Sequence, residues 1–194
     1  MPNFPCIPNF GYFDSPDFLL LSLHLCTIIS TPIYFLGLYC ILCKTPDAMK
    51  SVKWSLLVLH VWIVIFDYTV SVLTVPYLLI PEFAGIPFGI LRDLGVPTSA
   101  QIVFTIAVMG CMIVSIVSIY ENRFFILCEI SWRTAWKIGR RVWLFFHYLL
   151  VLGFVTFLFL LIPDQKSAVE EVFRNLPCLP ESIYQEDVFI LASD

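Results

Sequence analysis

Four long runs of uncharged, mostly apolar residues alternate with short charged connections along the chain. A helix needs about 20 apolar residues to cross the roughly 30 Å hydrocarbon core of a membrane, and each run is long enough. Only the second run contains a charged residue, Asp67. The pattern predicts an all-α membrane protein with four transmembrane helices, at about residues 18–43, 54–80, 98–120 and 142–163.

The composition agrees with a membrane location. The chain is 59% hydrophobic and 13% charged, which is about half the charged fraction of a soluble domain. With four spans in 194 residues, little chain remains for a separate soluble domain. We find no nucleic-acid-binding motif, no Gly-rich phosphate loop and no nucleophile elbow, so the sequence predicts neither a nucleic-acid partner nor a cofactor.

The charges of the connections predict the orientation. Of the 11 Lys and Arg residues, eight lie in the loops at 44–53 and 121–141, and three lie elsewhere. Basic residues accumulate on the cytoplasmic side, so these two loops are expected inside the cell. Residues 1–17 then form an extracellular tail. Residues 164–194, which hold seven acids, form a second extracellular segment.

Local signals predict where several helices begin and end. Thr45-Pro46-Asp47 reads as an N-cap, a proline at the first helical position and an acid, so the second helix is expected to start there. Thr98 and Gln101 have capping-box spacing, which predicts the start of the third helix. Pro76 is expected to kink the second span, with an irregular loop following to Pro97. Residues 166–175 are predicted to form a short amphipathic helix.

Asp67 is an acid near the middle of the second span. Such a residue costs about 2.5–3.5 kcal/mol on insertion scales, so it should face protein or water rather than lipid. It could be an ion or proton site that biases a conformational switch, or a hydrogen-bonded acid that holds helices together; the sequence leaves both open. His60, two turns earlier, is interpreted as a packing residue rather than a metal ligand.

Small and polar residues recur along one side of the third span. They follow one another at steps of four, three and four residues: Cys111, Ser115, Ser118 and Asn122. In lipid, such a stripe marks the face that packs on other helices. We therefore expect the third span to be central in the bundle, and prefer this interpretation to a ligand-contacting face.

Glu121, Asn122 and Arg123 end the third span beside a short basic loop. Basic residues commonly end membrane helices on the cytoplasmic side, which is enough to explain an arginine there. The alternative is that Arg123 pairs with an acid in the resting state and is released towards a cytoplasmic partner.

The seven cysteines divide by their expected compartment. Cys6 and Cys178 are the two expected outside, where disulfides persist, and could form a bond between the tail and the outer segment. No His, Cys or carboxylate cluster has zinc-ligand spacing, so no metal site is predicted.

Several segments together resemble one family. They are IYFLGLYCILCKTPDAMKSVK at 33–53, the following run from WSLLVLHVW to GIPFGIL, LGVP near Gln101, ENR at 121–123 and LPCLP at 176–180. As a set they resemble the class H serpentine receptors of nematodes, which are chemosensory G-protein-coupled receptors. The resemblance covers essentially the whole chain.

The resemblance implies a seven-helix receptor in the plasma membrane of a sensory cell, with a small environmental molecule as ligand and a heterotrimeric G protein as cytoplasmic partner. It places Glu121, Asn122 and Arg123 where related receptors carry an acid, an arginine and an aromatic residue. Here Asn122 separates the acid from the arginine, and Phe124 stands in the aromatic position.

The chain shows four spans where the family has seven. It then corresponds to the N-terminal four-helix portion of such a receptor, with residues 164–194 in its second outer loop, and is expected to be truncated and inactive alone or to pair with other receptor chains. Two alternatives are a structural four-span protein and a transporter or membrane-enzyme subunit that uses Asp67. Because no paired acid or histidine motif accompanies Asp67, the chain is not expected to be an enzyme.

Overall fold

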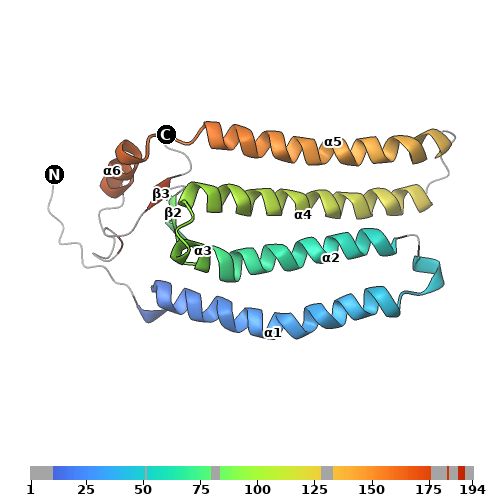
Figure 1. Cartoon of the computed structure of the whole chain (residues 1–194), viewed down its shortest axis with the longest axis horizontal. Coiled ribbons are helices and arrows are strands. Elements are labelled where there is room, and N and C mark those ends of the chain that lie inside the picture. The colour runs from blue at the N-terminus through green and yellow to red at the C-terminus, as the bar shows by residue number, and fades with distance from the viewer. Residues whose placement is uncertain are drawn as a thin grey trace.

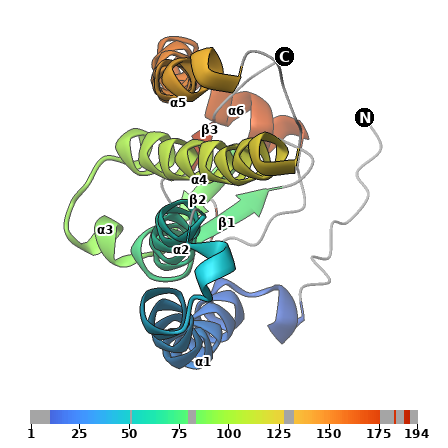
Figure 2. The ribbon, with the colours of Figure 1, turned by 90° about the vertical axis from the view of Figure 1, so that its right-hand side faces the viewer.

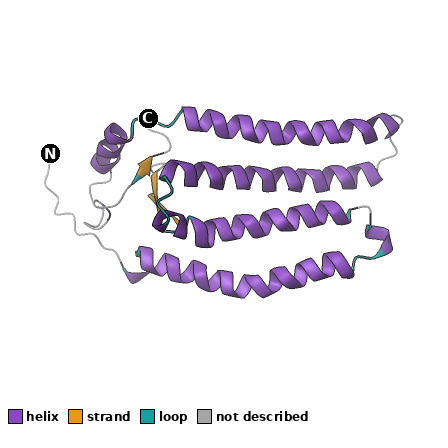
Figure 3. Cartoon of the chain, viewed as in Figure 1, coloured by secondary structure: helices purple, strands orange, loops and turns teal. Residues whose placement is uncertain are grey.

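The computed structural model describes residues 11–50, 52–79, 84–127, 133–175, 183 and 188–190. Helices dominate it, with a small sheet at one end (Figure 3). The elements in chain order are the turn η1 (Tyr12–Asp14), α1 (Pro16–Cys43), the turn η2 (Asp47–Met49), α2 (Lys53–Tyr68), the π-turn η3 (Thr69–Leu73), β1 (Pro76–Leu79), β2 (Ala84–Pro87), α3 (Ile90–Asp93), α4 (Thr98–Leu127), α5 (Arg133–Leu160), α6 (Gln165–Asn175) and β3 (Phe189–Ile190).

Four long helices lie side by side in the order α1, α2, α4, α5 (Figures 1 and 2). Each is long and apolar enough to cross a membrane, over Pro16–Cys43, Lys53–Leu73, Thr98–Leu127 and Ile138–Leu160. The prediction of four membrane helices is therefore confirmed. α4 packs between α2 and α5, which also confirms the third span as a central helix.

α1 begins where its sequence provides the start signals. The Ser15 side chain accepts a hydrogen bond from the Phe18 backbone N–H at 3.2 Å, and Pro16 occupies the first helical position. Large apolar side chains on the outward faces of the helices, such as Ile28, Phe35 and Leu160, are exposed. A lipid environment would cover these side chains.

The start of α2 differs from the prediction. Thr45 does not cap α2, because its hydroxyl donates to the Ile41 carbonyl in the last turn of α1. A short 3₁₀ turn follows at Asp47–Met49, and α2 begins only at Lys53. The Lys53 ammonium donates to the Leu42 carbonyl at 2.7 Å, so both side chains complete the end of α1 instead.

The end of the second span also differs. The helix stops at Leu73 through the π-turn η3, and Pro76 begins β1 rather than kinking a helix that continues to residue 80. Val75, just before the proline, has φ of 37°, a left-handed conformation that is strained for a β-branched residue. Gly89 packs against this turn, and a Cβ there would lie 2.2 Å from the Leu73 carbonyl oxygen.

The loop after the second span is ordered. β1, β2 and β3 form an antiparallel sheet in that order, with Tyr77 opposite Ile86 and Ala84 opposite Ile190. α6 covers it, and its Ala168 and Val172 are buried, which confirms the amphipathic helix. The buried core consists of Leu79, Ala84, Ile86, Ala168, Val172, Ile183, Val188 and Ile190. We call this end of the bundle the sheet end, and the opposite end the far end.

Tyr77 ties the sheet to the first turn of the chain. Its hydroxyl donates to the Asp14 carbonyl at 2.9 Å. Partial burial raises the pKa of Tyr77, and the nearby negative charge of Asp14 raises it further. The sheet end therefore gathers the start of α1, the connection between α2 and α4, and the segment after α5.

Candidate functional site

A buried carboxylate joins α4 to α5 near the far end of the bundle. Glu121 of α4 is 9% exposed, and its Oε2 lies 2.5 Å from Nε of Arg140 on α5. Oε2 has this ion pair but no hydrogen bond of good geometry among the described residues. Trp136 of α5 donates its indole N–H to Oε1 at 2.8 Å. Glu121 is therefore buried with a cationic partner, as a buried carboxylate requires.

Asn122 and Arg123, which follow Glu121 in the sequence, lie in different surroundings. Asn122 is buried, and its Oδ1 accepts a hydrogen bond from Nη1 of Arg140 at 2.9 Å. Arg123 is exposed and forms no ion pair within the described part of the chain. The structure thus brings Glu121 and Asn122 together on Arg140 and leaves Arg123 apart from them.

Sequence reasoning missed Arg140 and Trp136, because Arg140 was counted only among the basic residues that set membrane orientation and Trp136 was given no role. The sequence signal for a different partner was the spacing between Glu121 and Arg123, which lie two positions apart. Residues i and i+2 do not face each other on a helix, so Glu121 needs a partner other than Arg123. A basic residue early in the next antiparallel helix was the available one.

The small polar stripe on α4 faces its neighbouring helices. Ser115 is buried, donates to the Cys111 carbonyl at 2.9 Å and lies 3.4 Å from the Tyr148 hydroxyl of α5. Ser115 and Ser118 line a small cavity of about 260 Å³ together with Trp54 of α2. The position of α4 between α2 and α5 supports the packing interpretation of the stripe.

Asp67 lies in a polar seam between α1 and α2. Across this seam the Thr27 hydroxyl donates to Ser71 Oγ at 2.7 Å, and the Thr31 and Tyr68 hydroxyls lie 2.6 Å apart. Asp67 Oδ2 is buried and has no hydrogen-bond partner among the described residues. The carboxyl group as a whole lies close enough to Tyr34 of α1 to interact with that side chain. Asp67 therefore interacts with α1 across the seam.

His60 has a packing role in the same seam. Its Nε2 lies 3.0 Å from the Tyr34 carbonyl oxygen, and its ring fills the space beside Gly37, where a Cβ would meet it at 2.9 Å. Among the described residues, no group of three or more His, Cys, Asp or Glu side chains could hold a metal ion.

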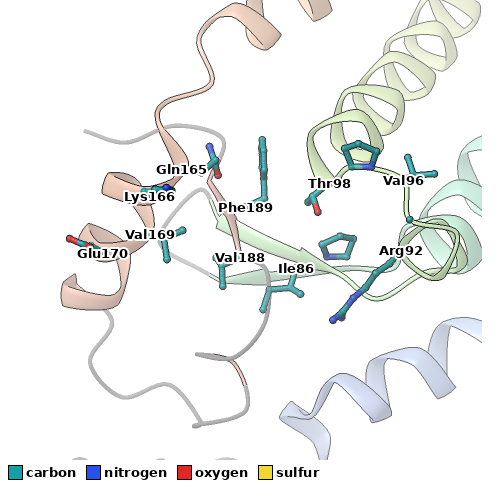
Figure 4. A pocket seen from close by; sticks show the side chains of 13 residues that line it. Ile86, Arg92, Val96, Thr98, Gln165, Lys166, Val169, Glu170, Val188 and Phe189 are labelled. Atoms are coloured by element: carbon teal, nitrogen blue, oxygen red, sulfur yellow. The ribbon is translucent and has the colours of Figure 1, made fainter.

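A cavity of about 800 Å³ opens at the sheet end and was not foreseen from the sequence. Figure 4 shows side chains from β2, the α3–α4 connection, α6 and β3 around it. Its charged lining comprises Arg92, Lys166 and Glu170, and its apolar lining includes Val188 and Phe189. Its size is within the range of small-molecule sites.

Cys6 and Cys178, the predicted disulfide pair, both lie outside the described residues. Four cysteines within the described part are free thiols: Cys26, Cys40, Cys43 and Cys111.

Comparisons with known proteins agree with the membrane fold. A family model described as the serpentine type 7TM GPCR chemoreceptor Srh matches residues 14–194. The chain is 28% identical to serpentine receptor class H-72 of Caenorhabditis elegans over 188 residues, which are 97% of this chain and 55% of that receptor. The chain therefore spans about half the length of the curated relative that it matches. No solved structure matches it.

Proposed function

Since the chain belongs to the Srh family of serpentine chemoreceptors, we propose that it supplies the first four membrane helices of a receptor for small environmental molecules. It is a multi-pass membrane protein, and its family consists of chemoreceptors rather than enzymes. The observation that carries the proposal is the family match over almost the whole chain, together with four candidate membrane helices.

We propose that the sheet end faces outside the cell and contributes to ligand binding. The eight-to-three division of basic residues supports this orientation, since the far end holds the basic loops. The cavity of about 800 Å³ at the sheet end supports a ligand of small-molecule size. Its charged and apolar lining suits a molecule with one polar group on an apolar body.

At the far end, the proposed partner is a heterotrimeric G protein, and the proposed contact surface includes the exposed Arg123. Within its described residues this chain offers four candidate spans, whereas the family architecture has seven. We therefore expect it not to signal when it is produced alone. Polar faces such as that of Ser115 and Ser118 favour association with further helices in the membrane.

A complementation experiment tests this function. The chain is produced in cells with a G-protein activation reporter, either alone or with the portion of the class H-72 receptor that it does not match. Each is exposed to a panel of volatile alcohols, ketones and esters and to bacterial culture extract. We expect responses only from the complemented receptor, and their loss in Arg123→Ala. A response from the 194 residues alone that Arg123→Ala abolishes would show that they couple without further helices.

A further inference from the structure

The ENR triplet cannot form an acid–arginine pair within its own helix. Successive residues of an α-helix are rotated by about 100°, so Glu121 and Arg123 project about 200° apart. Side chains two positions apart do not face each other. Glu121 therefore points away from Arg123 and needs a partner on a neighbouring helix.

The neighbouring helix is α5, and its Arg140 contacts both Glu121 and Asn122. Arg140 reaches Glu121 Oε2 through Nε at 2.5 Å and Asn122 Oδ1 through Nη1 at 2.9 Å. Trp136, one turn earlier on α5, donates a hydrogen bond to the other carboxylate oxygen of Glu121. The Arg140 side chain is 23% exposed and that of Glu121 is 7% exposed, so the pair is screened weakly by water.

We propose that Arg140 is the positioning residue of this end of the receptor: its pairing with Glu121 locks the ends of α4 and α5 together and leaves Arg123 directed to the partner. The inference rests on the proposed function only for the identity of that partner. Removing one member of such a pair leaves a buried charge uncompensated, so the loss of either residue should separate the two helix ends.

The test measures the separation of the two helix ends directly and requires no G protein. The full 194-residue chain, with its native cysteines replaced, carries spin labels at Leu127→Cys and Ile138→Cys in lipid nanodiscs. Both positions are exposed. A second labelled pair, Met109→Cys and Phe154→Cys, reports on the same two helices farther from the lock. Pulsed electron resonance gives a distance distribution for each pair.

Four variants isolate the ion pair from general packing. We expect Arg140→Gln and Glu121→Gln each to shift the far-end distance to longer and broader values and to leave the second pair unchanged. The double exchange Glu121→Arg with Arg140→Glu restores the charge pairing and should return the distribution towards wild type. Arg141→Gln, which removes the adjacent exposed arginine, is the matched control and should change neither distance.

Three results would overturn the proposal. An Arg123→Gln variant that opens the helix ends as Arg140→Gln does would assign the pairing to Arg123. Unchanged far-end distances in Arg140→Gln would show that no lock exists. A shift of both labelled pairs that persists in the double exchange would mark a general packing role. Failure of the complementation experiment changes none of these distances, so the two proposals fail separately.

Discussion

Gly110 of α4 lies directly against Val151 of α5: a Cβ on Gly110 would come within 2.6 Å of Val151 Cγ1. Small residues at such a position let two membrane helices approach closely, and dispersion contacts then hold them together. Gly110 lies one residue before Cys111, where the polar stripe begins. The close approach therefore determines how tightly that stripe is held against α5.

We predict that Gly110→Ala separates α4 from α5. The added methyl group meets a β-branched side chain that cannot rotate away freely, and overpacking of this kind costs about 1–3 kcal/mol. Thermal unfolding in detergent should show a lower melting temperature. Gly153→Ala on α5 is the control, because a Cβ there meets nothing within 4 Å and alanine favours the helix. A melting temperature of Gly110→Ala as high as that of Gly153→Ala would contradict the close contact.

The second prediction concerns orientation. Because eight of 11 basic residues lie in two loops, glycosylation acceptors engineered near Asn9 and Ser167 should be modified, and one near Ser131 should not. Translation into microsomes, followed by deglycosylation, measures this as gel shifts. Modification at the middle site alone would invert the topology and remove the basis of the receptor proposal.

Elements set by local sequence were predictable. The four apolar runs, the start of α4 at Thr98 and the amphipathic α6 depend on hydrophobicity and periodicity over a few turns. The predicted capping box was wrong, because Gln101 Oε1 accepts no hydrogen bond among the described residues and its amide donates instead to the Val96 carbonyl at 2.8 Å. Thr45 shows the same limit, since one hydroxyl could serve either of two helix ends, and tertiary structure selected α1.

The sheet and the lock depend on partners that are distant in sequence. Ala84 pairs with Ile190 across the sheet, although α3, α4, α5 and α6 separate the two positions in the sequence. Likewise, Glu121 was singled out from the sequence as a switch candidate, but neither its burial nor its partner Arg140 was predicted. Helical spacing excluded Arg123 as that partner, but only the packing of α4 on α5 selects one arginine among several in the loop.

The third prediction concerns Asp67. Its buried Oδ2 lacks a hydrogen-bond partner among the described residues, and a carboxyl group within a membrane span costs free energy on insertion, so replacing it by an amide should lower that cost. Asp67→Asn should insert as well as wild type or slightly better, and should keep the seam between α1 and α2. Asp67→Lys should insert poorly, since it puts a cation in the same place. If Asp67→Lys inserts and folds as wild type does, the residue faces water or lipid, and a role in switching loses its basis.

The last prediction concerns Gln165, which stabilises the sheet end by acting as an extra strand partner. Its Oε1 accepts the Ile190 backbone N–H at 2.9 Å, and its Nε2 donates to the Ile190 carbonyl at 3.1 Å. Ile190 is fully buried, so both backbone groups would be left unpaired in Gln165→Ala. Each such group costs about 1–3 kcal/mol.

Hydrogen exchange measured by mass spectrometry should therefore show faster exchange in β2 and α6 of Gln165→Ala, with the four long helices unchanged. Gln165→Glu should lie between Ala and wild type, because a carboxylate still accepts the N–H but cannot donate to the carbonyl. Ser167→Ala is the control, since among the described residues that exposed hydroxyl bonds only to Asp164 of its own turn. Exchange in Gln165→Ala as slow as in wild type would show that the apolar core holds β3 in place without the amide.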